Sequence, residues 1–487
     1  MRKTGILLFV AALLCGCGGK DDPEIIPDPA PVLTGSVPEN NAADIAAGSL
    51  TITLSFDQMV KCQEKDRISV NDSQVSIGTV QSLGKDITIE LSGLKLEKSY
   101  TVTIPEGVII GIRKNQKKVQ EIKLSFTTAR DFSWWESASD AVANMGTGWN
   151  LGNTLDSNSY DRTSSTPGWI AQYSDGTPAA WETAWGQPVT SPELLKMFAD
   201  AGFGAIRVPV TWAEHMDNAG NVDKAWMDRV EQVVNYVLDA GMYCIINVHH
   251  DTGEKGWLVA DGNYYSQTYA KFQKLWKQIA ERFNKYGEKL LFESFNEMLD
   301  ADNHWNTAGA GAYETIYKYN TDFVNTVRAS GGNNSNRNLI VNTYAASAEA
   351  SVFKAFELPE DSAKDHLIAE FHSYAPYEFA FEMEDKSRQK TVFDAYCESV
   401  VTQIMTNAYD NLVKRGIPVI VGEYGGTAST TTETELAKQA ACYVSNGRKY
   451  GIACFYWMSL SDGEDRSVPK WTRPLLKQAI LNAFNNQ

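Results

Sequence analysis

The chain has 487 residues, which is enough for one barrel-sized domain and one smaller module. It is 43% hydrophobic and 21% charged, as is typical of a globular protein, and its formal net charge is −16. This acidic balance argues against nucleic acid and anionic lipid surfaces as binding partners, because both require clustered Lys and Arg, and it favours a neutral substrate.

The first residues have the pattern of a bacterial export signal. Two basic residues precede a short apolar run that ends in the letters LCGC at positions 14–17, and the run is too short to span a membrane. The pattern resembles a lipoprotein signal, in which residues 1–16 are removed and Cys17 carries the lipid. An ordinary signal peptide is the alternative.

Residues 17–31 are rich in Gly, Asp and Pro, and they predict a linker. Gly18 follows the cysteine in place of an Asp, which argues against retention in the inner membrane. The letters KDD at 20–22 resemble the acidic signal that sends some Gram-negative lipoproteins to the cell surface. We therefore expect a lipid anchor in the outer membrane with the protein on the cell surface; a secreted or periplasmic location is the alternative.

The next segment, residues 32–129, alternates apolar and polar residues with a period of two. Strands are expected at 49–56, 86–93, 99–107 and 121–129, with turn residues between them. The segment predicts a small β-sandwich that resembles the bacterial Ig-like modules fused to secreted enzymes. It contains no convergent polar residues, so a role as a rigid spacer is favoured and glycan binding is the alternative.

From residue 131 to residue 487 the pattern changes to apolar runs separated by helical segments. The eight runs are 146–152, 204–210, 243–250, 290–297, 338–344, 366–374, 417–425 and 452–459. Helices are expected at 132–145, 191–201, 223–240, 266–286, 311–330, 398–415 and 432–449. Eight buried strands with helical crossovers predict an α/β fold, a (β/α)8 TIM barrel. A doubly wound open sheet is the alternative, but GWNLGN after the first strand is not a phosphate-binding loop.

Polar residues gather where these predicted strands end. They are Asn150, Arg207, His249, His250, Asn296, Glu297, His372, Tyr374, Glu423 and Trp457. In such barrels the active site forms at the carboxyl ends of the strands. Glu297 and Glu423 follow the fourth and seventh strands, which lie across the barrel mouth. Two facing carboxyl groups are what cleavage of a glycosidic bond requires, one to protonate the leaving oxygen and one to attack the anomeric carbon.

Three neighbours are expected to support this pair. Asn296 can hold a sugar hydroxyl next to the reacting carbon. Arg207 is expected to keep Glu423 ionised, because a nearby cation lowers the pKa of a carboxyl group. Tyr374 can orient Glu423 through a hydrogen bond.

The motifs LFESFNE and VGEYG resemble the two catalytic signatures of glycoside hydrolase family 5. The letters MGTGWNLGNTLD, ETAWGQP, RVPVTW and INVHHD resemble its subfamily 4, which holds β-glucanases and xyloglucanases. The resemblance implies that Glu297 is the acid/base and Glu423 the nucleophile, with the other polar residues lining the site. It also implies a cis peptide bond between Trp457 and Met458. Met298 and the letters FYWMSLSDGEDRSV depart from the usual family pattern.

The expected activity is therefore that of a monomeric endo-acting retaining β-1,4-glucanase, acting on cellulose, mixed-linkage β-glucan or xyloglucan by double displacement. The candidate stacking platforms for sugar rings are Trp181, Trp185, Trp305 and Trp457. The alternatives are an endo-β-mannanase or another β-glycanase, and a non-catalytic glycan-binding lipoprotein.

No cofactor or metal is expected. His249 and His250 are neighbours on a predicted strand, so their side chains should point to opposite faces and not share one ion. No HExxH motif accompanies them, and no GxSxG elbow of an esterase is present. After the leader, five widely spaced cysteines remain, which do not form a disulfide framework.

Overall fold

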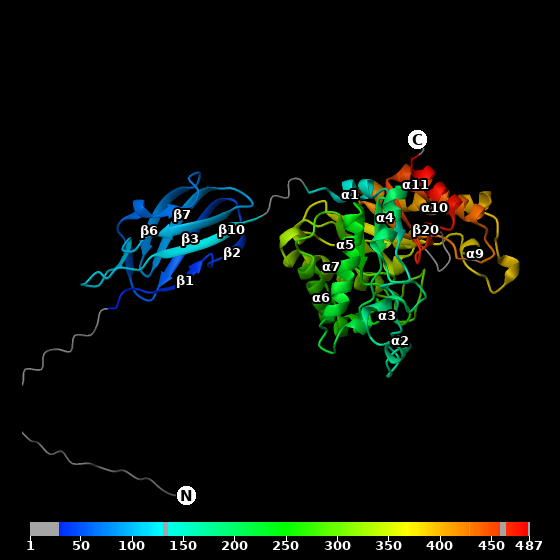
Figure 1. Ribbon diagram of the computed structural model, residues 1–487, viewed down its shortest axis with the longest axis horizontal. Coiled ribbons are helices and arrows are strands. Elements are labelled where there is room, and N and C mark those ends of the chain that lie inside the picture. The colour runs from blue at the N-terminus through cyan, green and yellow to red at the C-terminus, as the bar shows by residue number, and fades with distance from the viewer. Residues whose placement is uncertain (1–28, 130–134, 428, 458–463, 486–487) are drawn as a thin grey trace, which may run out of the picture. The chain divides into compact units, whose positions relative to one another are not determined.

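The computed structural model describes residues 29–129, 135–427, 429–457 and 464–485 (Figure 1). The chain divides into two compact units, Met1–Asp131 and Phe132–Gln487. The predicted lipoprotein signal, its lipidation site Cys17 and most of the linker lie outside the described residues. Among the helices that are described, none is long and apolar enough to cross a membrane.

The first unit is a β-sandwich, as predicted. One sheet has the order β1 (Leu33–Val37), β3 (Gly48–Phe56), β7 (Asp86–Leu94), β6 (Ser76–Leu83). The other has the order β2 (Ala42–Ile45), β10 (Ile122–Thr128), β8 (Ser99–Ile104), β5 (Ser69–Val70), and β4 (Val60–Cys62) pairs with β9 (Ile109–Gly111). In β3 the side chains of Ile52, Leu54 and Phe56 are buried, while the residues between them face outward. This alternation forms the core between the sheets.

The sandwich exposes no aromatic side chain in its described part. Residues 29–129 contain Phe56, Tyr100 and Phe126 as their aromatic residues, and each is at most 3% exposed. Sugar rings bind to protein surfaces largely through exposed aromatic faces, so this module offers no such platform.

Deletion of residues 32–129 is therefore expected to leave turnover of soluble oligosaccharides within about twofold of the full-length value. The sandwich and the barrel have separate hydrophobic cores, and every candidate catalytic residue belongs to the barrel. The measurement is kcat/KM for both forms, with a thermal melt to show that the barrel is folded. A hundredfold loss in a folded barrel would show that the module contributes to the site.

The second unit is a closed barrel of eight parallel strands, which confirms the predicted fold class. The strands are β11 (Thr147–Asn150), β12 (Ala205–Val208), β13 (Tyr243–Asn247), β14 (Leu290–Glu293), β15 (Leu339–Asn342), β16 (Leu367–Ser373), β17 (Val419–Tyr424) and β18 (Ile452–Tyr456). They follow one another around the barrel in chain order, and β11 pairs with β18 to close it. The alternative open sheet is wrong.

Helices cover the outside of this barrel (Figure 1). The longer ones are α1 (Ala138–Met145), α4 (Pro192–Ala201), α5 (Lys224–Asp239), α6 (Gly262–Arg282), α7 (Ala312–Ala329), α10 (Ala395–Asn411), α11 (Glu433–Tyr450) and α12 (Pro474–Asn485). The loops hold α2 (Trp169–Tyr173), α3 (Pro178–Glu182), α8 (Ala350–Ala355), α9 (Tyr377–Ala380) and the short strands β19 (Glu464–Asp465) and β20 (Lys470–Trp471).

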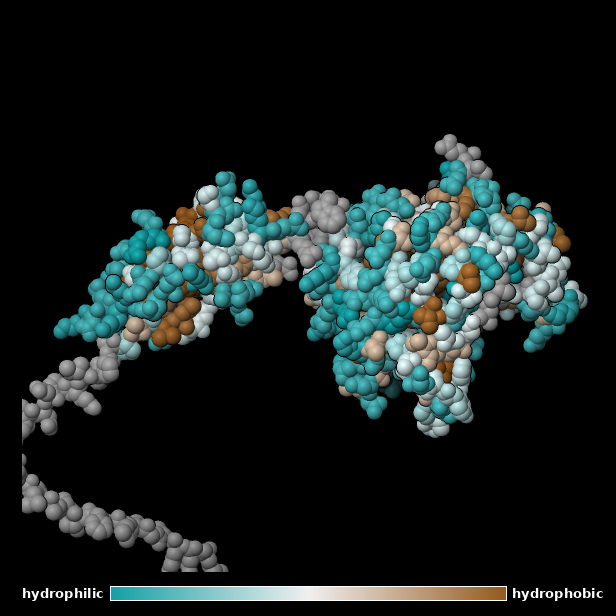
Figure 2. Space-filling view, in the orientation of Figure 1, coloured by the Kyte–Doolittle hydropathy of each residue, from teal (hydrophilic) through white to brown (hydrophobic). Residues whose placement is uncertain are grey.

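Helix α4 shows how the sequence sets these boundaries. The Ser191 side chain accepts a hydrogen bond from the backbone N–H of Leu194, and Pro192 occupies the first turn, where no N–H is needed. Gly202 ends the helix with φ of 105°, a left-handed conformation that favours glycine. The outer surface in view is mostly hydrophilic, with apolar side chains in scattered patches (Figure 2).

The barrel interior changes from apolar to polar along the strands. Buried apolar side chains form one layer, contributed by Ala205, Ile245, Leu291, Ile340, Ile368 and Ile420. Two residues further along their strands stand Arg207, Asn247, Glu293, Asn342 and Glu370, which we call the interior polar layer. All five side chains are fully buried. Since side chains alternate with a period of two, both sets point into the barrel, and the polar layer lies nearer the carboxyl ends of the strands.

Candidate active site

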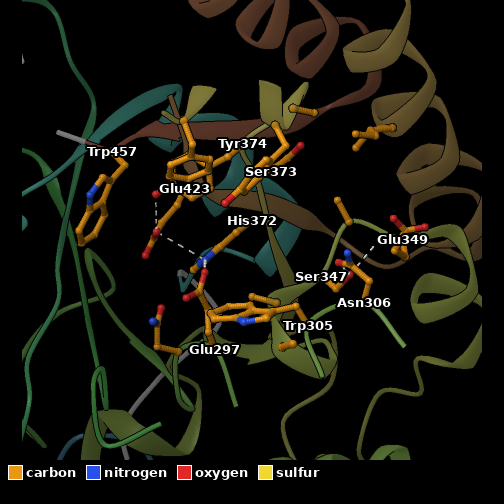
Figure 3. A pocket seen from close by; sticks show the side chains of 18 of the residues that line it. Glu297, Trp305, Asn306, Ser347, Glu349, His372, Ser373, Tyr374, Glu423 and Trp457 are labelled. Atoms are coloured by element: carbon orange, nitrogen blue, oxygen red, sulfur yellow. Dashed lines mark hydrogen bonds and ion pairs between the residues drawn. The ribbon is translucent and has the colours of Figure 1, made fainter. Parts of the chain in front are cut away.

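A cavity of about 640 Å³ opens at the carboxyl ends of the barrel strands (Figure 3). Eight of the ten predicted site residues line it: His249, His250, Asn296, Glu297, His372, Tyr374, Glu423 and Trp457. They come from the carboxyl ends of β13, β14, β16, β17 and β18, which the closed barrel brings to one face although more than 200 residues separate the first from the last.

Glu297 and Glu423 face one another, with His372 between them (Figure 3). His372 Nδ1 lies 2.8 Å from Glu297 Oε1 and 3.6 Å from Glu423 Oε2. One oxygen of each carboxyl group and a His372 ring nitrogen lie within 4.8 Å of one another. Inverting glycosidases need carboxyl groups about 6.5–9.5 Å apart to admit a water, whereas retaining enzymes place them about 5–5.5 Å apart. The close approach here matches the retaining arrangement.

Glu423 is held as an anion. Tyr374 donates a hydrogen bond to its Oε2 at 2.7 Å, and Arg207 donates to its Oε1 at 2.8 Å, so both expected contacts are present. Burial raises the pKa of the Glu423 carboxyl, but the positive charges of His372 and Arg207 and these hydrogen bonds outweigh it, so the pKa lies below its ordinary value. An ionised, oriented carboxylate is what a nucleophile requires.

His372 supplies part of that positive charge. Burial lowers its pKa, but the charge of Glu423 and the hydrogen bonds with Glu297 and Glu370 outweigh burial and raise the pKa to about 10. The ring is therefore an imidazolium at neutral pH. Its positive charge lies between the two carboxyl groups and compensates for negative charge on them.

The positions of Asn150 and Arg207 correct the expectation that both line the site. Both are fully buried and neither lines the cavity. Arg207 uses all five of its N–H groups below the cavity floor: two bind Glu293 at 2.6 and 2.8 Å, and the others bind Asn150, Glu423 and Asn296. Both residues fix the catalytic groups from beneath, because the polar layer lies deeper in the barrel than the cavity.

Asn296 is placed to bind substrate. Its Oδ1 accepts a hydrogen bond from Arg207 Nη2 at 2.8 Å, which fixes the orientation of the amide. Its Nδ2 group donates to none of the described residues, and the side chain lines the cavity. The amide can therefore donate to a sugar hydroxyl beside the reacting carbon.

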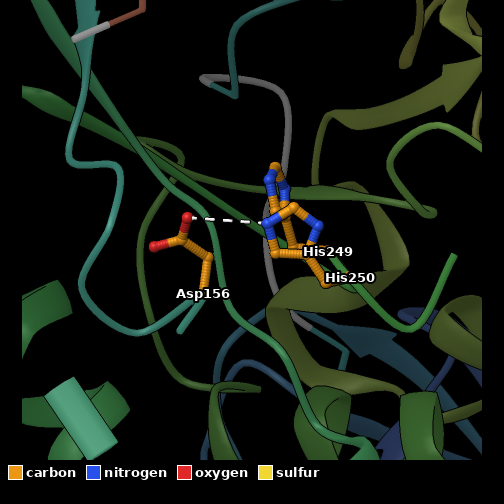
Figure 4. A group of neighbouring side chains, drawn as sticks. All are labelled: Asp156, His249 and His250. Carbon is orange, nitrogen blue, oxygen red and sulfur yellow. Dashed lines mark ion pairs between the residues drawn. The ribbon is translucent and has the colours of Figure 1, made fainter. Parts of the chain in front are cut away.

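His249 and His250 lie together, which corrects the expectation that they point apart (Figure 4). Strand β13 ends at Asn247, so both follow it in a loop where the strand alternation does not apply. Their ring centroids are 4.4 Å apart, and one ligand atom of each lies within 4.8 Å of one from Asp156.

The partners of these groups favour a role in the cavity wall over metal binding. His249 Nδ1 lies 3.0 Å from Asn247 Nδ2, an N–H donor, so this nitrogen acts as an acceptor. Burial lowers the pKa of His249 well below its usual value, so the ring is neutral. Both Asp156 oxygens already accept backbone N–H groups, from Asn153 and Thr154.

The four predicted stacking platforms differ in their surroundings. Trp457 lines the cavity parallel to His249, at 5.7 Å between ring centroids, and Gly152 leaves room for it because a Cβ there would lie 2.8 Å from the indole. Trp305 lines the opposite part and is 43% exposed. Trp181 is 5% exposed and cannot stack on a sugar, which corrects that prediction. Trp185 packs on His250 and does not line the cavity.

Met458, and with it the predicted cis bond, lies outside the described residues.

Two buried acids, Glu293 and Glu370, were not predicted from the sequence. Both belong to the interior polar layer and lie within ion-pair distance of Arg207. The sequence could have predicted them, because a carboxyl group within a buried apolar strand needs a paired charge. Arg207, an arginine within another buried strand, was the candidate partner for both carboxyl groups.

Comparison with known families agrees with this geometry. Residues 171–463 match the family described as cellulase (glycosyl hydrolase family 5), and residues 27–128 match a bacterial Ig-like domain. Endoglucanase A of Ruminococcus albus is 34% identical over 71% of this chain and 92% of its own length. Endoglucanase A of Clostridium longisporum is 32% identical over 72% of this chain, which spans 66% of that relative.

Solved structures show the same relationship. A family 5 glycoside hydrolase from Prevotella bryantii, in complex with a xyloglucan tetradecasaccharide, is 42% identical with a TM-score of 0.64, covering 72% of this chain and 99% of that one. A broad-specificity endoglucanase of subfamily 4 from Ruminococcus champanellensis, with bound cellotriose, is 35% identical with a TM-score of 0.64, covering 71% and 99%. By its barrel, its facing carboxyl groups and these matches, the chain belongs to glycoside hydrolase family 5.

Proposed function

We propose that the protein is a retaining endo-β-1,4-glucanase that uses Glu423 as nucleophile and Glu297 as acid/base. The observation that carries the proposal is the close, facing pair of carboxyl groups, one ionised by Arg207 and His372 and the other directed into the same cavity. The match to family 5 and to relatives named endoglucanase supports the activity.

In the first step, a Glu423 oxygen attacks the anomeric carbon and the glycosidic bond breaks. Glu297 gives its proton to the leaving oxygen, so the aglycone departs as an alcohol. In the second step, Glu297 takes a proton from water, the water oxygen attacks the same carbon, and the bond to Glu423 breaks. The carboxyl groups return to their starting states, and two displacements leave the anomeric configuration unchanged.

The proposed substrates are cellulose, mixed-linkage β-glucan and xyloglucan. One similar structure is titled as a complex with xyloglucan and another with cellotriose, and a lichenase from Caldicellulosiruptor that is 31% identical was solved with cellotetraose. Trp305 and Trp457 present aromatic faces to the cavity, as long chains of sugar rings require. A panel of purified polysaccharides with product sizing tests this proposal.

On that panel we expect a rapid fall in β-glucan viscosity and oligosaccharide products of several lengths. If the enzyme cleaves only mannan, the proposed β-glucan substrates are wrong and the protein is an endo-β-mannanase, the alternative given from the sequence. Release of single sugars or dimers from chain ends, without a fall in viscosity, would contradict an endo mode of attack.

The proposed location is the outer membrane, with Cys17 lipidated and the enzyme on the cell surface as a monomer. The support is the LCGC motif and the KDD letters that follow it. Metabolic labelling with a palmitate analogue should mark the wild-type protein and not a Cys17→Ala variant. Protease treatment of intact cells should remove the enzyme; protection from protease would place it in the periplasm.

A further inference from the structure

Glu370 on β16 is a buried acid that the reaction above does not use. Its side chain is fully buried in the interior polar layer, with Oε1 3.3 Å from His372 Nε2 and 3.5 Å from Arg207 Nε. Its other oxygen, Oε2, has no hydrogen-bond partner among the described residues. Burying a carboxyl group with one oxygen unpaired costs free energy, so a neutral residue here would be better tolerated if packing were the only requirement.

The neighbouring strand is built around this carboxyl group. A Cβ at Gly422 would lie 1.5 Å from Glu370 Oε1, so any other residue at Gly422 would collide with the carboxyl group. Gly422 directly precedes the nucleophile Glu423. Because Gly422 of the VGEYG motif has no side chain, the Glu370 carboxyl group has room to lie beneath the catalytic pair.

The contacts of Glu370 lead to the acid/base through one ring. His372 Nε2 faces Glu370, and His372 Nδ1 faces Glu297 at 2.8 Å. With a carboxyl group at each nitrogen, the imidazole plane and the direction of its Nδ1–H bond are fixed. We propose that Glu370 is a positioning residue that acts through His372 on Glu297, an inference that rests on the proposed function of Glu297.

The charged groups around Glu370 and His372 determine in which direction the Glu370 charge shifts the pKa of His372. Arg207 from β12, Glu293 from β14 and His372 from β16 face Glu370, while Glu297 and Glu423 face His372 on its other side. Burial and the Glu293 carboxylate raise the pKa of Glu370 to about 7, against the lowering effects of Arg207 and His372. Glu370 therefore gains its negative charge as the pH rises through neutrality. That charge keeps His372 cationic, so that Nδ1 keeps the proton that it donates to Glu297.

The Glu370→Gln variant tests this inference because it keeps the shape and removes the charge. We expect the alkaline limb of the kcat/KM profile to move about one pH unit lower, because His372 then loses its proton, and with it the hydrogen bond to Glu297, at a lower pH. The acid limb and KM should change little, since Glu370 touches neither Glu423 nor substrate. In a His372→Asn background the same substitution should no longer move the alkaline limb.

Glu182→Gln is the matched control. Glu182 is also a fully buried glutamate paired with an arginine, Arg229, but its hydrogen bonds run to Arg229 and the Thr190 N–H and none to His372. Its replacement is expected to lower the melting temperature and to leave the alkaline limb in place. A general loss of stability would affect both variants alike, whereas the proposed role affects only Glu370→Gln.

A second measurement does not depend on activity. The chain has six histidines, so ¹⁵N-histidine labelling gives few signals, and His372→Asn identifies the one from His372. We expect the pKa of His372 to fall by about one unit in Glu370→Gln. If the wild-type enzyme cleaves no β-glucan, the proposed function fails, but this titration still shows whether Glu370 controls His372.

If Glu370→Gln does not fold, Glu370→Asp replaces it. The shorter side chain keeps the charge and withdraws it from Nε2, so we expect a lower kcat, an unchanged KM and altered ¹⁵N shifts of the His372 ring. A His372 titration and an alkaline limb that match the wild type in a folded Glu370→Gln protein, or wild-type kcat and ring shifts in Glu370→Asp, would overturn the proposal.

Discussion

Replacing Glu423 by glutamine is expected to lower kcat on β-glucan by on the order of 10⁵-fold. The amide cannot displace the leaving group, so the first step is lost. The fold should persist, because the glutamine oxygen can still accept from Arg207 and its amino group can donate to the Tyr374 hydroxyl. The measurement is steady-state kinetics on a soluble β-glucan, with calorimetric melting of both proteins.

The control for this experiment is the thermal transition itself. A folded variant without activity supports the assignment of Glu423 as nucleophile. A folded variant with turnover within tenfold of the wild type would show that another group attacks the anomeric carbon.

Replacing Glu297 by alanine is expected to lower kcat on polysaccharide by about 10³–10⁴-fold, because no group then protonates the leaving oxygen. A substrate with an activated leaving group, such as a dinitrophenyl β-cellobioside, should still form the intermediate, since its leaving group needs no proton. The second step should then be slow, because no base activates water. Azide needs no base and should restore turnover.

The product of that rescue identifies the step. Attack by azide on an intermediate held by Glu423 gives a β-glycosyl azide, which NMR distinguishes from the α form. Azide should not accelerate the wild-type enzyme or the Glu423→Gln variant. An α-glycosyl azide, or no effect of azide on Glu297→Ala, would contradict the assigned roles.

The barrel could be predicted from the sequence because its strands are buried on both sides. Each of the eight apolar runs contains one observed strand, as 290–297 contains Leu290–Glu293. The strands of the sandwich were harder to predict from the sequence. Strand β6, Ser76–Leu83, is mostly exposed and shows little apolar alternation, and β5 has only two residues. Strands of this kind form because neighbouring strands pair with them, and local patterns do not record that pairing.

The residues of the site could be predicted from their places at strand ends, but their depth could not. Asn150 and Arg207 end their strands as Glu423 does, yet they lie below the cavity floor. Depth depends on the stagger between strands around the barrel, which no single strand encodes. The orientations of His249 and His250 were wrong for a related reason, since the strand ends at Asn247, before both of them.

The proposed mechanism requires Glu423 to form a covalent bond to the sugar. A 2-deoxy-2-fluoro-β-cellobioside with a dinitrophenyl leaving group slows the second step more than it slows the first, so the intermediate should accumulate. Mass spectrometry of the intact protein should show one added fluorocellobiosyl group, and the labelled peptide should carry it on Glu423. A label on Glu297 or Glu370, or an unlabelled protein that releases a product of inverted configuration, would contradict the account.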